Sequence, residues 1–143
     1  MQSRATTYWE GDLMSGKGKT TAASGTFRDV SLSWKARTEG VASNTTPEEL
    51  LAASHASCFS MALSHALAQG GHAPRRLETA CTVEFGPKAG GGFEVKSSSL
   101  EVKGQVPGID QAAFQKAAED AKNGCPISAA LKIPMKVKAT LQG

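Results

Sequence analysis

The sequence predicts an α+β domain with mostly antiparallel strands, in the order β-β-β-α-β-β-α-α-β. Three observations carry this prediction. The first third holds short β-branched and aromatic patches separated by Gly and Asp, residues 46–69 form one long apolar stretch between helix start and stop signals, and the last half alternates strand-like runs with an alanine-rich segment. At 143 residues the chain is most simply a single domain, residues 1–143.

Three strands are expected before the long apolar stretch. The segments "ATTYWEG" (5–11), "KTTAASG" (19–25) and "VSLSW" (30–34) show partial alternation of apolar and polar residues. The Gly and Asp residues between them are typical of turns, so the three runs predict a small sheet.

A long helix is expected over residues 46–69. Thr46 is a suitable N-cap, Pro47 suits the first helical position, and Glu49 stands where a capping box places its acidic residue. Gly70-Gly71 provides the stop signal.

This helix is apolar or small on nearly all its faces, which indicates burial on all sides. Its apolar run is interrupted by serines and histidines, so we interpret it as a core helix rather than a membrane span. A small domain has little interior for a helix of about 36 Å, at 1.5 Å per residue. We therefore expect part of its surface to pack against a second copy of the chain.

The rest of the chain predicts a hairpin, two helices and a last strand. Residues 75–85 and 93–106 flank a glycine-rich "GPKAGGG", and the second run is long enough to bend near its serines. Asp110 caps an alanine-rich helix that closes at Asn123-Gly124, and Pro126 begins a short helix in "CPISAALK". Residues 133–141 alternate as a half-buried strand does.

The charged residues exclude one class of partner and the cysteines indicate a compartment. The net charge of +3 comes from 16 Lys and Arg against 13 Asp and Glu scattered along the chain, which is not the concentrated footprint of a nucleic-acid-binding protein. The N-terminus lacks the apolar core of a signal peptide, and three cysteines do not make a secreted disulfide scaffold. We expect a cytoplasmic protein.

Each cysteine has a plain structural interpretation. Cys58 in mid-helix reads first as a small buried hydrophobic residue, and Cys81 shares the parity of the apolar Val83 and Phe85 in a strand-like run, which predicts a core position. Cys125 lies where one helix ends and another begins, and the positive end of a helix dipole lowers a thiol pKa.

Metal and cofactor sites find little support. His55-x-x-Cys58 has a feasible helical spacing, and His65, Cys81 and Cys125 are conceivable further ligands, but no CxxC or HExxH module is present. The chain has no dinucleotide fingerprint and no phosphate-binding loop. We expect no metal and no cofactor.

Five segments carry a resemblance to a known family. They are "YWEGDL" (8–13), "RTEG" (37–40), "TTPEELLAASHASCFSMAL" (45–63), "PGID" (107–110) and "NGCPIS" (123–128). Together, and in this order, they resemble the osmotically inducible protein C / organic hydroperoxide resistance (OsmC/Ohr) family, specifically its OsmC branch.

The resemblance implies a cofactor-free thiol peroxidase, built as an intertwined homodimer with active sites at the subunit interface. It would reduce organic hydroperoxides, and H₂O₂ more weakly, in oxidative and osmotic stress defence, with a lipoyl-bearing protein as the dithiol donor. Position by position, Cys58 matches the peroxidatic cysteine, Cys125 the resolving cysteine, Glu48 the active-site carboxylate and Arg37 the arginine of the OsmC branch.

Physical chemistry suits these implied roles. A cysteine attacks as thiolate, and burial raises the pKa of Cys58, so a nearby cation is needed. Arg37 supplies a permanent charge that Glu48 can hold through a bidentate pair. Glu48 and Cys58 lie ten positions apart, about 15 Å along a helix, so we expect Glu48 to serve the site from the partner chain.

Two further expectations concern reactivity. An apolar approach to Cys58, with Leu51, Phe59 and Met61 as candidate walls, would favour alkyl hydroperoxides over H₂O₂. By local electrostatics Cys125 would be the better nucleophile, and only the family pattern reverses that order.

Two rival functions share the same residues. A hydroperoxide sensor would use the cysteines as a disulfide switch with little turnover. A small structural or zinc-stabilised binding module would need neither thiol for chemistry.

Overall fold

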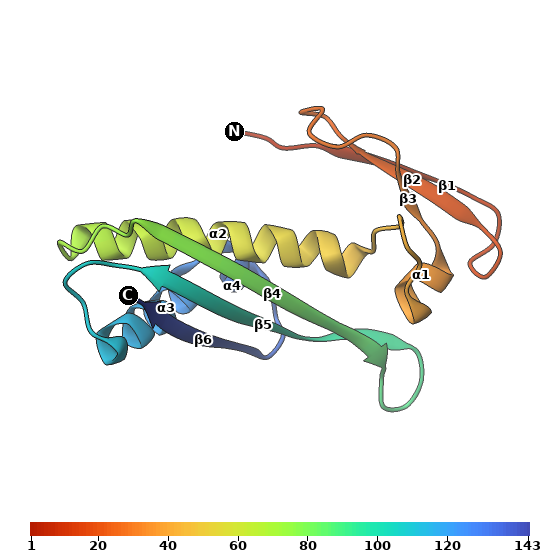
Figure 1. The fold of residues 1–143 in the computed structure, drawn as a ribbon. Helices are drawn as coiled ribbons and strands as arrows, with labels where there is room; N and C mark the ends of the chain where they lie inside the picture. Colours follow the sequence, from red (N-terminus) through yellow and green to blue (C-terminus); the bar gives the residue numbers. More distant parts are fainter. The chain divides into compact units, whose positions relative to one another are not determined.

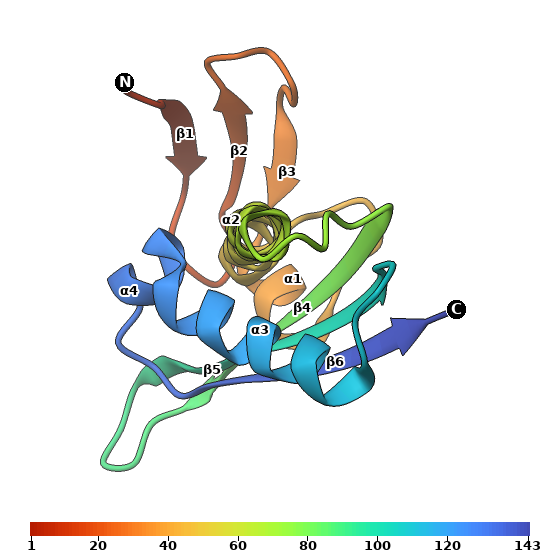
Figure 2. The ribbon, with the colours of Figure 1, turned by 90° about the vertical axis from the view of Figure 1, so that its left-hand side faces the viewer.

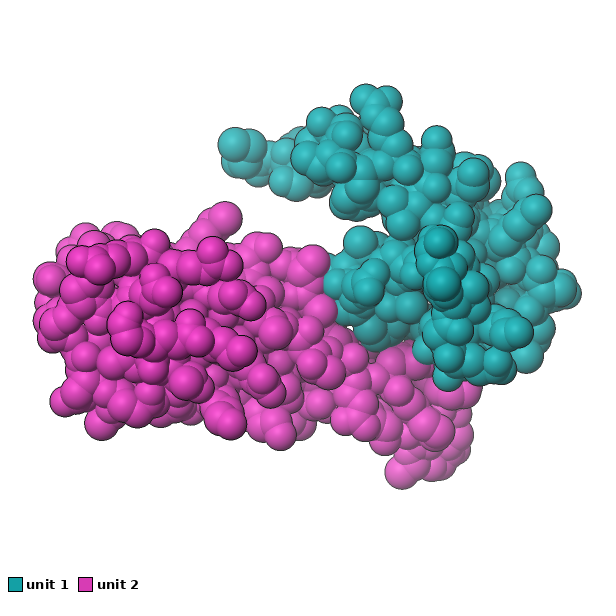
Figure 3. Space-filling model, in the orientation of Figure 1, with its two compact units in different colours: residues 1–50 teal, residues 51–143 magenta.

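The structure, a computed structural model, describes all 143 residues and forms two compact units, residues 1–50 and 51–143 (Figure 3). The predicted α+β class is confirmed, with one helix more than expected (Figure 1). The elements, in chain order, are β1 (Ala5–Glu10), β2 (Lys17–Ala22), β3 (Val30–Leu32), α1 (Trp34–Glu39), α2 (Pro47–Gln69), β4 (Arg76–Pro87), β5 (Phe93–Gln105), α3 (Gln111–Gly124), α4 (Pro126–Ala130) and β6 (Met135–Gln142).

The first unit contains an antiparallel sheet in the order β1-β2-β3. The turn between β1 and β2 is stabilised by Asp12, whose carboxylate accepts hydrogen bonds from the Ser15 amide at 2.8 Å and from its hydroxyl at 2.9 Å. Gly11 enters this turn at φ 88°, a conformation that favours glycine. These contacts end β1 at Glu10, close to the predicted boundary.

Helix α1 was not predicted, and it begins where the expected strand 30–34 was to end. Ser33 caps it by accepting a hydrogen bond from the Ala36 amide at 3.1 Å, and Gly40 closes it at φ 79°. Ser33 and Gly40 are ordinary start and stop signals, but six residues with only Ala36 buried leave no apolar stripe to recognise. The helix places Arg37 in its last turn.

Both ends of α2 lie where the sequence predicts them. The Thr46 hydroxyl accepts the Glu49 amide at 3.0 Å, which confirms the N-cap, whereas the Glu49 carboxylate accepts the Thr45 hydroxyl at 2.8 Å. At the other end Gly71 adopts φ 83°, and the amides of Gly71 and His72 return to carbonyls of the last turn in a Schellman motif.

The second unit contains a sheet in the order β4-β5-β6, antiparallel between β4 and β5 but parallel between β5 and β6. A parallel pair needs a long crossover, and α3 and α4 provide it. The β4–β5 register shifts opposite Glu84 and Phe85, where β5 carries Lys96 as an extra residue just before its serines. This irregularity lies where the sequence predicts a bend.

The core of this unit lies between the sheet and the helices α2 and α3, which Figure 2 shows with α2 end-on. Along α2, every fourth residue from His55 to Leu67 is buried, which forms one stripe. The fully or nearly buried core residues are Phe59, Leu63, Leu67, Leu100, Val102, Val106, Phe114, Ala118, Ala121, Cys125, Val137 and Ala139.

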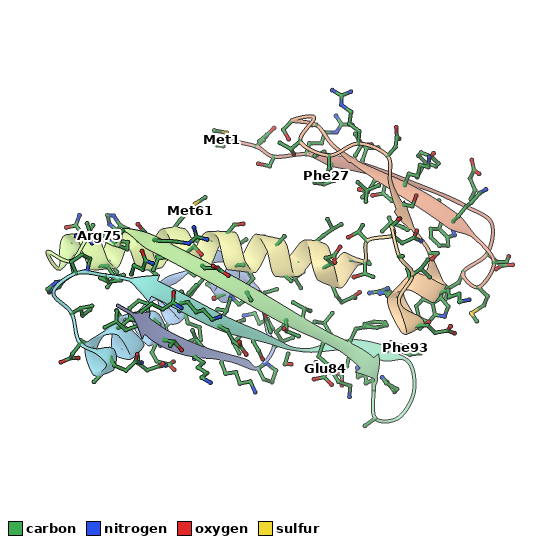
Figure 4. All side chains as sticks on the ribbon, in the orientation of Figure 1. Met1, Phe27, Met61, Arg75, Glu84 and Phe93 are labelled. Carbon is green, nitrogen blue, oxygen red and sulfur yellow. The ribbon has the colours of Figure 1, made fainter.

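One chain covers less of α2 than its composition led us to expect. Only 22% of its most apolar 18-residue window is buried, and Met61 is 73% exposed, projecting away from the sheet (Figure 4). By length and composition alone the helix could cross a membrane, a property shared by core helices of soluble proteins. Burial on all sides is therefore not achieved within a single chain.

Candidate active site

The predicted ion pair between Arg37 and Glu48 is present in the first unit. Arg37 Nη2 donates to Glu48 Oε1 at 2.7 Å, and Nε donates to Oε1 and Oε2 at 3.0 and 3.2 Å. The Glu48 side chain is 8% exposed and that of Arg37 30%. Two parallel donors on one carboxylate fix the orientation of the guanidinium as well as its position.

This pair forms within one chain, between the last turn of α1 and the first turn of α2. The Glu48 carboxylate therefore lies beside Arg37 of its own chain. That Glu48 serves the site around Cys58 from the partner chain stays a prediction.

Arg37 also lines an apolar pocket of about 320 Å³ in the first unit. Its walls are Trp9, Leu13, Leu32, Ser33, Trp34, Arg37 and Pro47. None of the walls proposed from the sequence is among them, and Phe59 is fully buried in the core of the other unit, so it cannot line an open approach. Trp34 could have been found as a large apolar residue three positions before the arginine, whereas nothing in the sequence places Trp9, 28 positions before it, at this pocket.

The second unit brings Cys58 and Cys125 close to each other as free thiols. Cys58 lies on α2 and is half-buried, whereas Cys125 is fully buried at the junction of α3 and α4. The Cys125 amide donates to Ala121 at 2.9 Å, and its carbonyl accepts from Ala129 at 3.0 Å. The backbone of both helices thus holds the buried sulfur in place.

The two thiols differ in acidity. Burial raises the pKa of Cys58, and the hydrogen bond with Cys125 raises it further, against a smaller opposite effect of the Ile127 amide. Burial also acts to raise the pKa of Cys125, but hydrogen bonds from Cys58, from the Ser128 amide and hydroxyl and from the Ile127 amide together lower it. Within this unit Cys125 is the more acidic thiol, as local electrostatics suggested.

His55, considered above only as a metal ligand, is a fully buried member of a polar network. Its Nδ1 lies 2.6 Å from the Ser98 hydroxyl and its Nε2 lies 2.7 Å from the Ser128 hydroxyl. Both ring nitrogens are engaged, so neither is available to a metal. Cys81 packs against the core, and its sulfur also lies 3.1 Å from the Ser98 hydroxyl.

Comparison with known proteins places the chain in a family. Residues 40–140 match the family model described as OsmC-like protein. Peroxiredoxin OsmC of Escherichia coli (strain K12) is 40% identical over 125 residues, which is 87% of this chain and 86% of that protein. The protein of the same name from Shigella flexneri matches equally.

Solved structures resemble this one over nearly their whole length. The organic hydroperoxide resistance protein OhrB of Bacillus subtilis is 26% identical with a TM-score of 0.74, covering 99% of this chain and 98% of that one. An organic hydroperoxide resistance protein of Elizabethkingia anophelis, 23% identical with a TM-score of 0.74 and covering 100% and 96%, shares the fold. The fold, the matched segment and the identity agree: this chain belongs to the OsmC family.

Proposed function

We propose that this chain is a thiol peroxidase that reduces organic hydroperoxides to alcohols, and H₂O₂ more weakly. Cys58 is its peroxidatic cysteine and Cys125 its resolving cysteine. The observation that carries the proposal is the contact between a half-buried thiol and a fully buried one, on elements far apart in sequence. The names of the relatives, Peroxiredoxin OsmC and organic hydroperoxide resistance protein, support it.

The first step oxidises Cys58. Its thiolate attacks the distal oxygen of the hydroperoxide, the O–O bond breaks, and the alkoxide takes a proton and leaves as the alcohol. The sulfur keeps one oxygen as a sulfenic acid, which accounts for both electrons transferred to the peroxide.

The second step closes a disulfide. The Cys125 thiolate attacks the Cys58 sulfur and displaces hydroxide, which becomes water on protonation. A dithiol donor then attacks the disulfide, passes through a mixed disulfide and leaves as its own cyclic disulfide, which returns both thiols. We propose a lipoyl-bearing protein as this donor.

The Arg37–Glu48 pair supplies the cation that Cys58 needs. A guanidinium close to the sulfur favours its thiolate and reverses the acidity order of the two isolated thiols. The same donors can bind a peroxide oxygen. The apolar pocket beside Arg37 supports organic hydroperoxides as the preferred substrates, because an apolar wall binds an alkyl or aryl group better than it binds H₂O₂.

The site is completed in a homodimer of cytoplasmic subunits that defend against oxidative and osmotic stress. Support for the dimer comes from α2, whose apolar surface a single chain leaves largely uncovered. The family match begins at residue 40 in the first compact unit and ends at residue 140 in the second, which supports one functional domain over residues 1–143.

The test is peroxide-driven oxidation of dihydrolipoamide by the unaltered protein, Cys58→Ser and Cys125→Ser, with cumene hydroperoxide and with H₂O₂. The unaltered protein should turn over, faster with cumene hydroperoxide. Cys58→Ser should be inactive, and Cys125→Ser should be oxidised at Cys58 without forming the intramolecular disulfide. Dithiol oxidation no faster than without enzyme would refute the peroxidase and favour the sensor.

A further inference from the structure

The helix that carries Arg37 has little packing of its own. Helix α1 is six residues long, and Ala36 is its one buried residue. Isolated helices of this length are unstable in water, so contacts from outside must hold α1 in place. The ion pair with Glu48 fixes the end of the Arg37 side chain, but it does not fix the backbone from which that side chain extends. The contacts that fix this backbone lie at the start of the helix.

Asn44, a half-buried residue in the loop between α1 and α2, supplies one of these contacts. Its Nδ2 donates a hydrogen bond to the Ser33 hydroxyl at 3.0 Å. The same hydroxyl accepts the Ala36 amide at 3.1 Å, and the Ser33 carbonyl accepts the Arg37 amide at 3.3 Å. A hydroxyl oxygen has two lone pairs, so it can accept both donors. Asn44 is therefore joined to the backbone of Arg37 through a single residue.

The loop holds Asn44 in a defined position. Asn44 forms a parallel bridge with Ser31 of β3, and the next amide, that of Thr45, donates to the Ser31 carbonyl at 3.0 Å. Ser43 has φ 69°, a left-handed conformation that is uncommon for residues other than glycine. Such a conformation persists where the surrounding contacts determine it. The strained residue directly precedes the one whose side chain reaches Ser33.

The residue after Asn44 supports the other partner of the ion pair. Thr45 is buried, and its hydroxyl donates to the Glu49 carboxylate at 2.8 Å in the first turn of α2. Glu48, the neighbour of Glu49 in that turn, accepts the Arg37 guanidinium. Asn44 and Thr45 therefore secure the start of α1 and the start of α2. A shift of either helix would move one partner of the ion pair against the other.

The Asn44 contact is not needed to satisfy the ends of α1. Ser33 already caps the helix through the Ala36 amide, and the Gly40 amide closes it on the Ala36 carbonyl at 3.1 Å. What Asn44 adds is a link between the start of α1 and the loop that precedes α2. Arg37 lies one turn beyond this link, so a small rotation of α1 about Ser33 would displace the guanidinium. A bidentate pair tolerates little displacement, because two donors must meet one carboxylate together.

We propose that Asn44 is a positioning residue for Arg37. Through the Ser33 hydroxyl it holds α1 where the guanidinium pairs with Glu48, which keeps the cation available to the Cys58 thiolate. This inference rests on the proposed function. It assigns Asn44 no contact with the peroxide or with either thiol. It predicts slower oxidation of Cys58 when the contact is lost, and no change in the closure of the disulfide.

The experiment separates the two chemical steps in a single turnover. Reduced protein is mixed with rising concentrations of cumene hydroperoxide and quenched with acid, and the Cys58–Cys125 disulfide is counted by mass spectrometry. At low hydroperoxide the rate reports the oxidation of Cys58, and at saturating hydroperoxide it reports the closure of the disulfide. In parallel, the rate of Cys58 alkylation by iodoacetamide is measured across a range of pH.

Four variants are compared with the unaltered protein, after thermal unfolding has confirmed that each is folded. Asn44→Ala removes the donor, and it is made alone and in an Arg37→Ala background. Ser33→Gly breaks the same contact from the other side, because glycine is a tolerated N-cap. Thr38→Ala is the matched control, since it changes an exposed residue of α1 whose hydroxyl donates to the Trp34 carbonyl within the same helix.

We expect Asn44→Ala to slow the oxidation of Cys58 by about threefold to tenfold, the scale of one hydrogen bond, and to leave disulfide closure within about twofold of normal. The pH at which Cys58 becomes half-reactive toward iodoacetamide should rise, because a displaced guanidinium stabilises the thiolate less. Ser33→Gly should have the same two effects, and Thr38→Ala should have neither.

The Arg37→Ala background tests whether Asn44 acts through Arg37. Arg37→Ala alone should slow the oxidation of Cys58 more than Asn44→Ala does, because it removes the cation itself. Adding Asn44→Ala to it should change the rate by less than about twofold, since the two substitutions then affect one and the same interaction.

Normal oxidation of Cys58 in Asn44→Ala would overturn the inference, and so would an equal loss in Thr38→Ala. A loss that persists in full when Arg37 is already alanine would assign Asn44 a structural role alone and would also overturn it. If Asn44→Ala does not fold, the same outcomes are read from Ser33→Gly. If the unaltered protein forms no disulfide with the hydroperoxide, the proposed function itself fails, and the inference falls with it.

Discussion

The Glu48 carboxylate accepts three hydrogen bonds from the Arg37 guanidinium, the shortest at 2.7 Å, although neither side chain belongs to the large core of the second unit. The two residues lie eleven positions apart, so α1 and the loop after it place the cation before any substrate arrives. A cation oriented in this way needs little reorganisation when a thiolate or a peroxide forms beside it.

Arg37→Lys should keep the positive charge but lose the two parallel N–H donors that bind the Glu48 carboxylate. We expect kcat/KM for cumene hydroperoxide to fall by about tenfold or more, because a single ammonium cannot bind both carboxylate oxygens and still face the substrate. Glu48→Gln should leave the guanidinium misoriented and have a similar effect. Arg76→Lys is the matched control, since its pair with Glu78 is exposed at both ends and adds little. Equal loss in the control would contradict a specific role for the pair.

His55 should make stability depend on pH. Burial lowers the pKa of His55 below its ordinary 6.5. Between these two pKa values the unfolded chain binds a proton at His55 that the folded chain does not bind. His55 therefore does not reduce the free energy of unfolding above pH 6.5. As the pH drops from 6.5 toward the folded pKa, the free energy of unfolding falls by at most about 1.4 kcal/mol per pH unit. Urea unfolding at pH 7.5, 6.0 and 5.0 should show a steeper loss in the unaltered protein than in His55→Gln. Parallel curves would exclude the buried neutral ring.

Gly104→Ala should destabilise the second unit. A Cβ at this buried position of β5 would collide with the ring of Phe114 on α3, which is itself fully buried. Overpacking of this kind costs about 1–3 kcal/mol. Gly124→Ala is the matched control, because its Cβ would meet nothing and its backbone needs no positive φ, so its effect should stay within about 0.5 kcal/mol. Equal midpoints in urea would contradict the close packing.

Met61→Glu should weaken the proposed dimer. Met61 is exposed on the uncovered surface of α2, and a carboxylate buried there against a second copy would lack a partner. Analytical ultracentrifugation should find the unaltered protein and Met61→Leu dimeric at micromolar concentration, and Met61→Glu shifted toward monomer. If the unaltered chain sediments as a monomer at every concentration, the dimer is ruled out.

The features that the sequence predicts well are those made by neighbouring residues. Thr46 caps α2 through an amide three positions away, and Gly71 ends it through carbonyls of the last turn, so the signals and their partners are read together. Helix α1 escaped prediction because it has no apolar stripe, and the β5–β6 pair could not be recognised as parallel from either strand alone.

The candidate site depends on contacts between distant residues, which the periodicity of the sequence does not encode. The pairing of Arg37 with Glu48, and that of Cys58 with Cys125, came from the family resemblance rather than from periodicity. The two serines that hold His55 lie 43 and 73 positions from it, on a strand and on a short helix. Serine is common at exposed positions, so nothing in its sequence context marks these two as buried partners.

The complete burial of Cys125 has a consequence for the order of events. Acidity alone would expose this sulfur to oxidation first, but a thiol with no accessible surface is sheltered from peroxide. In the proposed reaction it becomes reactive only when its neighbour Cys58 carries an oxygen. In the proposed reaction, steric access therefore adds to the effect of the Arg37 guanidinium in making Cys58, and not Cys125, the cysteine that meets the oxidant. In the proposed reaction Cys125 also protects Cys58 from over-oxidation, because a disulfide that closes promptly leaves little sulfenic acid to be oxidised irreversibly.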